Sequence, residues 1–156
     1  MTKVNWSAAL SGLVLIGAAT AAVAQDIQPQ NGTWLVDTDV RSNAGCPQDM
    51  VELFSLSGPM PVEFTVPFNP TGLPQGHPSF SRVGPNQWFG KTDLSDTDAN
   101  GLYQMIVTNA YHVLSETEIA LERTMTLNVT GSRGAEIGLN RPTCTAILDI
   151  GMERQS

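Results

Sequence analysis

The segment Asp96-Thr97-Asp98-Ala99-Asn100-Gly101 has the residue spacing most typical of a chemical site. Oxygen-bearing side chains at alternate positions, followed by glycine, match the first half of the calcium-binding loop D-x-[DN]-x-[DN]-G. Asp93 adds a nearby carboxylate, but Val107 stands where that loop needs a bidentate glutamate. The half motif therefore favours a hairpin turn at Asn100-Gly101. The alternative is a calcium site formed by Asp93, Asp96, Asp98 and Asn100.

Residue types that can catalyse reactions are present, but not at the spacing of a known catalytic motif. The chain has no Gly-x-Ser-x-Gly, His-Glu-x-x-His, P-loop or Gly-x-Gly-x-x-Gly pattern. His77 lies in a Pro/Gly-rich loop without an identifiable partner, and His112 lies in an expected strand, where we expect a structural role. We therefore expect a protein that is not an enzyme and needs no cofactor. A small hydrolase using His77 is a remaining alternative.

The first 24 residues have the pattern of a cleavable export signal. Lys3 precedes an apolar, Ala-rich run over residues 8–23, and Ala22-Val23-Ala24 forms a small-x-small cleavage site before Gln25. The run is shorter than the roughly 20 residues that a spanning helix needs. We expect the mature protein to begin at Gln25, to be exported to the periplasm or secreted, and to have no membrane span.

Cys46 and Cys144 are the chain's two cysteines. In an oxidising compartment, two thiols of one domain normally form a disulfide. The chain has no Cys-x-x-Cys motif that would favour a metal or redox site. The sequence therefore predicts a Cys46–Cys144 disulfide.

The charge of the chain narrows the choice of partners. The whole sequence has 8 Lys and Arg against 15 Asp and Glu. Lys3 is the only charged side chain among the first 24 residues, so their cleavage leaves a net charge of −8. An acidic protein without a basic patch is not expected to bind nucleic acid. Glu116, Glu118 and Glu122 would line one face of a strand, either as a solvated face or as a patch for a basic partner.

Alternation of apolar and polar residues predicts several β-strands. Trp34 to Val40 alternate, with Asp37 and Asp39 on the polar side, and residues 64–68, 102–107, 119–129 and 143–150 are also β-rich. Residues 47–54 are the one candidate helix, and a strand is nearly as well supported there. The Pro/Gly-rich stretch 58–85 is expected to be irregular, with an edge strand or bulge at Pro67. The predicted fold is all-β: a single-domain antiparallel β-barrel or sandwich over residues 25–156, with at most one short helix.

Gly32-Thr33-Trp34, at the start of the first strand, resembles the Gly-x-Trp element of the lipocalins and related calycins. The resemblance implies a small exported β-barrel in which Trp34 closes one end and an arginine from late in the chain, Arg141 or Arg154, packs over it. Trp34, Phe64, Phe68 and Trp88 are the aromatic residues expected to build the core or to contact a ligand.

Three functions remain open at this point. The first is an exported, non-enzymatic β-domain that binds a small apolar or amphipathic ligand, or a protein partner. The second is a calcium-stabilised exported β-domain. The third is the small hydrolase considered above.

Overall fold

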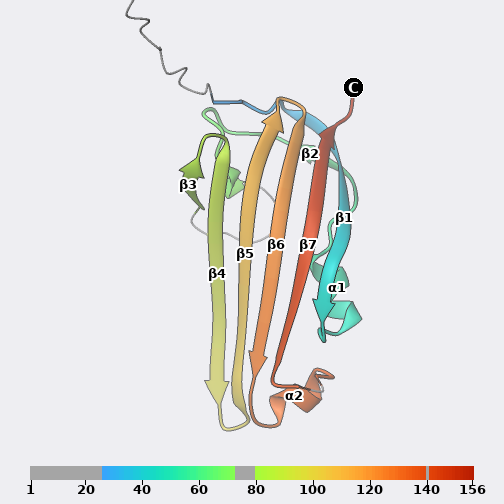
Figure 1. The fold of residues 1–156 in the computed structure, drawn as a ribbon, viewed down its shortest axis with the longest axis vertical. Helices are drawn as coiled ribbons and strands as arrows, with labels where there is room; N and C mark the ends of the chain where they lie inside the picture. Colours follow the sequence, from blue (N-terminus) through green and yellow to red (C-terminus); the bar gives the residue numbers. More distant parts are fainter. Residues whose placement is uncertain (1–25, 73–79, 140) are drawn as a thin grey trace, which may run out of the picture.

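The computed structural model describes residues 26–72, 80–139 and 141–156. The strands within these ranges form one antiparallel sheet. Neighbouring strands lie in the order β2-β1-β7-β6-β5-β4-β3 (Figure 1). Their bounds are β1 Gly32–Ala44, β2 Gly58–Val62, β3 Phe80–Gly84, β4 Gln87–Asp98, β5 Gly101–Ser115, β6 Glu118–Val129 and β7 Thr143–Arg154. The prediction of an all-β antiparallel fold is confirmed.

Helical structure in the described ranges is short. α1 spans Gln48–Phe54, so the helix rather than the strand is correct for residues 47–54. α2, Arg133–Glu136, and a 3-10 turn, Pro70–Gly72, were not predicted. No helix in these ranges has the length and apolar character needed to cross a membrane.

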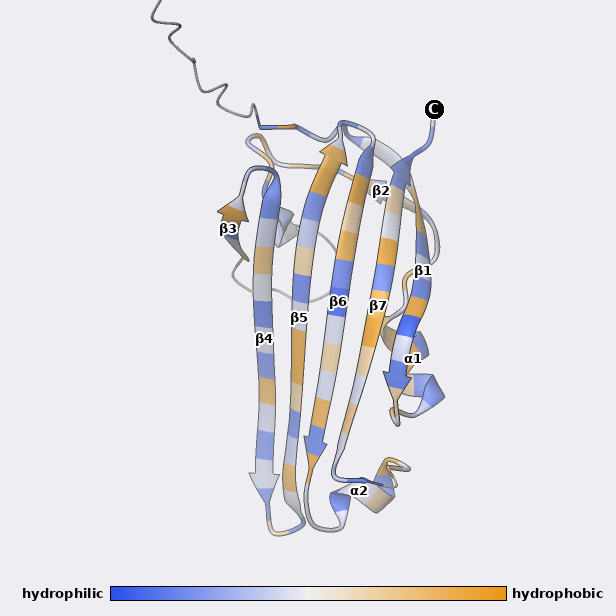
Figure 2. Ribbon diagram, viewed as in Figure 1, coloured by the Kyte–Doolittle hydropathy of each residue, from blue (hydrophilic) through white to orange (hydrophobic). Residues whose placement is uncertain are grey.

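The two faces of the sheet differ in their side chains. Along β6 and β7, buried and more exposed residues alternate, which Figure 2 shows as alternating apolar and polar bands. We call the buried side the packed face; Leu121, Leu148 and Ile150 belong to it. The opposite side, the open face, is formed by Leu35, Asp37 and Asp39 of β1, Ala110 and His112 of β5, Ala120 and Glu122 of β6, and Asp149, Gly151 and Glu153 of β7.

The packed face is covered by α1 and by the chain that follows it. Val51 of α1 is fully buried, and Phe64 and Phe68 of the irregular chain after β2 are buried as well. The predicted disulfide is present and joins Cys46, just before α1, to Cys144 in β7. Because it ties the covering layer to the sheet, the disulfide belongs to the core of the fold.

Residues 64–68 do not form the strand that their alternation predicts. The strand in this region is β2, which ends at Val62, and the chain beyond it is irregular. Pro67 has no N–H to donate to a strand ladder. Phe64 and Phe68 can bury their rings without a strand ladder. Pro59 and Pro61 are tolerated in β2 because it is an edge strand, paired only with β1 among the described strands.

Candidate functional site

The four aromatic residues selected from the sequence come together on the packed face. Trp34, Phe64, Phe68 and Trp88 form a continuous series of edge-to-face contacts, with ring centroids separated by 5.3, 5.4 and 4.9 Å. All four are buried. Such contacts add to the stabilisation from burial. The series links β1 to β4 through the covering chain, and this arrangement indicates a structural role.

Arg154, and not Arg141, lies beside the Gly-x-Trp element. Arg154 is the cross-strand partner of Trp34, and its Nε donates a hydrogen bond to the Asn31 carbonyl at 3.0 Å. The indole Nε1 of Trp34 donates to the Gln30 carbonyl at 3.1 Å. Arg141 lies instead against Gly45.

The acidic hairpin does not bring its four candidate calcium ligands together. Asp96 and Asp98 both bind the guanidinium of Arg133, with 2.9 Å between Asp96 Oδ2 and Arg133 Nη2. That guanidinium is the main reason why the pKa of Asp98 lies below its ordinary value. Asp93 projects from the other face of β4, where its carboxylate accepts a hydrogen bond from Gln104 at 3.1 Å. The described residues contain no group of three or more His, Cys, Asp or Glu that could hold a metal ion.

The turn of this hairpin differs by one residue from the prediction. Asp98 pairs with Gly101, so the two loop residues are Ala99 and Asn100, rather than Asn100 and Gly101. Gly101 opens β5 with a φ of +126°. A Cβ there would lie 2.1 Å from the Thr130 carbonyl oxygen. Glycine is therefore required by close backbone approach as well as by its φ.

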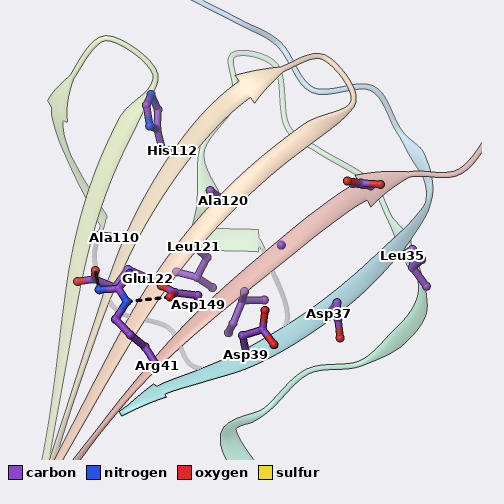
Figure 3. A pocket seen from close by; sticks show the side chains of 13 residues that line it. Leu35, Asp37, Asp39, Arg41, Ala110, His112, Ala120, Leu121, Glu122 and Asp149 are labelled. Carbon is purple, nitrogen blue, oxygen red and sulfur yellow. Dashed lines mark hydrogen bonds and ion pairs between the residues drawn. The ribbon is translucent and has the colours of Figure 1, made fainter.

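A hollow lies on the open face, where β1, β7, β6 and β5 lie side by side (Figure 3). Its volume is about 620 Å³. Ala110, Ala120 and Gly151 give it a shallow floor of small residues, because they leave space that larger side chains would fill. Acidic side chains surround this floor: Asp37, Asp39, Glu122, Asp149 and Glu153.

The sheet register places these acids opposite one another. Asp39, Asp149 and Glu122 are successive cross-strand partners on β1, β7 and β6, and Glu153 is the partner of Glu118. Like charges at directly opposed positions destabilise an antiparallel pair. The arrangement thus concentrates negative charge at a cost in stability.

Among the described residues, Arg41 is the one arginine or lysine that lines this hollow. It lies at the register shift of β1, between Val40 and Ser42. Its Nε donates to Asp149 Oδ2 at 2.8 Å, and its Nη1 donates to Glu122 Oε2 at 2.7 Å. These hydrogen bonds raise the pKa of the Arg41 guanidinium. Within the described ranges, Asp37, Asp39 and Glu153 form no ion pair.

Sequence reasoning found part of this site. It placed Asp37 and Asp39 on a polar strand face and grouped Glu122 with Glu118 and Glu116. Glu116 lies outside the hollow, in the turn before β6, where Gln30 donates to it at 2.7 Å. His77 lies outside the described residues. His112 is exposed and lines the hollow, rather than contributing to the core.

Asp149, Glu153 and Arg41 were missed, although a signal was available: Asp149 and Glu153 alternate with the buried residues of the predicted strand and its continuation.

Comparison of the chain with protein-family models, curated proteins and solved structures found no match. The fold and the site define an antiparallel β-sheet protein with an acidic, hollowed face.

Proposed function

We propose that this is an exported, non-enzymatic binding protein whose open face binds a basic, partly apolar segment of a partner protein. The observation that carries the proposal is the placement of mutually repelling acids around a hollow with a floor of small residues. The disulfide is compatible with export. The export pattern of the first 24 residues supports the same compartment.

Electrostatics favours a cationic partner. Asp37, Asp39 and Glu153 form no ion pair among the described residues, while Asp149 and Glu122 share Arg41. A lysine or arginine placed among these carboxylates would relieve their repulsion and gain charge-assisted hydrogen bonds. Complementary charge mainly increases the association rate and the specificity of such complexes.

The floor of the hollow adds an apolar contribution. Ala110 and Ala120 line it, and Leu35 on its β1 side is 43% exposed. Phe89, the cross-strand partner of Ala110, is 41% exposed and extends the same surface across β4. A segment that combines cationic and apolar side chains matches this surface better than a simple cation does, since burial of these side chains adds hydrophobic stabilisation.

The proposal is tested with a short peptide of alternating lysine and leucine, titrated by calorimetry at low ionic strength. We expect binding that weakens as salt is added, because surface charges are screened. The same peptide with glutamate in place of lysine should not bind. The triple variant Asp37→Asn, Asp39→Asn, Glu153→Gln should bind the lysine peptide about tenfold more weakly, since each lost contact contributes a fraction of a kcal/mol.

A second triple variant controls for net charge. Asp49→Asn, Glu63→Gln and Glu136→Gln remove the same number of acids from exposed positions that do not line the hollow. We expect this variant to bind the peptide nearly as well as the unmodified protein. Equal weakening in the two triple variants would show a non-specific effect of total charge and would refute the proposed site.

A further inference from the structure

A second hollow lies on the packed face, at the C-terminal end of α1. It has a volume of about 270 Å³ and lies where α1 meets β4, β5 and β6. We call it the α1 cleft; it is lined by Leu53, Phe54, Thr92, Leu94, Met105, Val107, Asn109 and Arg123. It belongs to the opposite side of the sheet from the acidic hollow, so the two sites are independent.

Most of the α1 cleft is apolar. Leu94 and Met105 are direct cross-strand partners on β4 and β5, and Val107 follows on the same face of β5. Leu53 is 73% exposed and Leu94 is 52% exposed, although both line the cleft. A ligand that covered these leucines would remove apolar surface from water and would be stabilised in proportion to the area buried.

The polar part of the cleft contains a buried charge. Arg123 is 1% exposed, and Asn109, its cross-strand partner, is buried as well. Arg123 Nε donates to Asn109 Oδ1 at 2.8 Å, and Arg123 Nη1 donates to the Phe54 carbonyl at 2.9 Å. These contacts fix the guanidinium at the cleft. Burial lowers the pKa of Arg123 from its ordinary value. An arginine nevertheless stays protonated in proteins.

A positive charge in a poorly solvated position attracts an anion more strongly than it would in water, because the local dielectric is low. This attraction depends on the charge of the guanidinium, whatever further contacts the guanidinium makes. Apolar walls together with a few converging polar groups are the usual composition of a small-molecule site.

We propose that the α1 cleft binds a small amphipathic carboxylate. Its carboxylate lies at the Arg123 and Asn109 part of the cleft, and its hydrocarbon chain packs against Leu94 and Met105. This inference goes beyond the proposed function, because it concerns another face of the sheet, another class of ligand and the opposite ligand charge.

The test compares three probes of equal chain length: octanoate and octylammonium below their micelle concentrations, and octanol below its solubility limit. Binding is followed by the backbone amide signals of β4 and β5 in NMR titrations. We expect octanoate to bind about tenfold more tightly than octanol, because its carboxylate is attracted by the charge of the guanidinium in a poorly solvated position. Octylammonium should bind more weakly than octanol. Equal affinity for octanoate and octanol would overturn the proposal.

Variants locate the site. Leu94→Ser should weaken octanoate binding about fivefold through lost apolar contact. Leu35→Ser, a similarly exposed leucine of the open face, should leave it unchanged. Arg123→Met should abolish the preference for octanoate over octanol. If Arg123→Met does not fold, Leu94→Ser and the three probes still decide the matter. Unaltered octanoate binding in Leu94→Ser would refute the α1 cleft as the site.

The outcome is separable from that of the open-face proposal. Octanoate at saturation should leave binding of the lysine and leucine peptide unchanged. The variant Asp37→Asn, Asp39→Asn, Glu153→Gln should bind octanoate as the unmodified protein does. Loss of octanoate binding in this triple variant would show that octanoate does not act at the α1 cleft.

Discussion

Glu118 on β6 and Glu153 on β7 are direct cross-strand partners, and both side chains project from the open face. Directly opposed like charges cost roughly 0.2–1 kcal/mol. We therefore expect Glu153→Gln to raise the free energy of unfolding by a few tenths of a kcal/mol at low ionic strength. The gain should shrink as salt is added. Urea denaturation at two salt concentrations measures both effects.

Glu63→Gln is the matched control, since Glu63 is exposed and lies outside the described strands. It should not stabilise the protein. An equal gain in Glu63→Gln would attribute the effect to the net charge of the whole protein rather than to the opposed pair. A stabilised Glu153→Gln that also binds the cationic peptide less well would show that the open face gives up stability for binding.

How far the sequence predicts the fold depends on the range of the interactions involved. β6 has a strict period of two over residues 119–129, because one side of the strand is buried along its whole length, and the prediction there is correct. Phe64 and Phe68 show the same period without forming a strand. Their rings contact Trp34 and Trp88 through packing that needs no strand ladder.

The candidate site is harder to predict than the strands that carry it. Asp37 and Asp39 can be assigned to a polar face from local alternation alone. Their grouping with Asp149 requires the register between β1 and β7, and Arg41 and Asp149 are 108 residues apart in the chain. Arg41 continues the alternation of Asp37 and Asp39, but its ion pair with Asp149 depends on that register, which includes a shift between Val40 and Ser42. No local pattern specifies it.

Substitution of Gly101 separates two effects: the close approach of a new Cβ to the Thr130 backbone, and the strain of a side chain at positive φ. Gly101→Ala should lower the free energy of unfolding by about 2–4 kcal/mol, because the new Cβ meets the Thr130 carbonyl oxygen and the φ is positive. Gly58→Ala is the control: Gly58 has a φ of +95° but open space around it. It should cost only about 1–2 kcal/mol. Thermal denaturation of the two variants compares them, and equal losses would contradict the contact with Thr130.

Arg133 gives a prediction about the acidic hairpin. Arg133→Met should raise the pKa of Asp98 toward its ordinary value, because the guanidinium is the main cause of the lowered pKa. A carboxyl group whose pKa is lowered by folding stabilises the protein above its unfolded pKa, and this contribution is lost as the pH falls through the folded pKa. The stability difference between Arg133→Met and the unmodified protein should therefore shrink in acid. Carboxyl NMR titration and acid unfolding test this.

The same hairpin should not respond to calcium. Arg133 holds Asp96 and Asp98, and Asp93 faces the other way, so calcium would have to displace an ion pair and gather ligands from two faces. We expect the same melting temperature in millimolar calcium and in chelator. A rise of several degrees in calcium that disappears in Asp96→Ala would show that Asp93, Asp96, Asp98 and Asn100 form a calcium site after all.

The burial of Tyr111 leads to a prediction about the free energy of unfolding in alkaline solution. It lies on the packed face of β5, and its ring is in edge contact with Phe80, with 5.3 Å between centroids. Burial raises the pKa of Tyr111 to about 12, and the positive charge of Arg123 opposes this with a smaller effect. An unfolded tyrosine ionises near pH 10. Between about pH 10 and pH 12, the unfolded chain therefore releases this proton while the folded protein retains it.

The free energy of unfolding should consequently fall through that window. The contribution of Tyr111 is fully present below about pH 10, and its loss by pH 12 amounts to roughly 2–3 kcal/mol. Tyr111→Phe removes the ionisable group while keeping the ring. The difference in urea midpoint between the unmodified protein and Tyr111→Phe should be constant below pH 10 and should then shift in favour of Tyr111→Phe. Parallel curves up to pH 12 would mean that Tyr111 ionises as easily in the folded protein as in the unfolded chain, and that its hydroxyl is not buried.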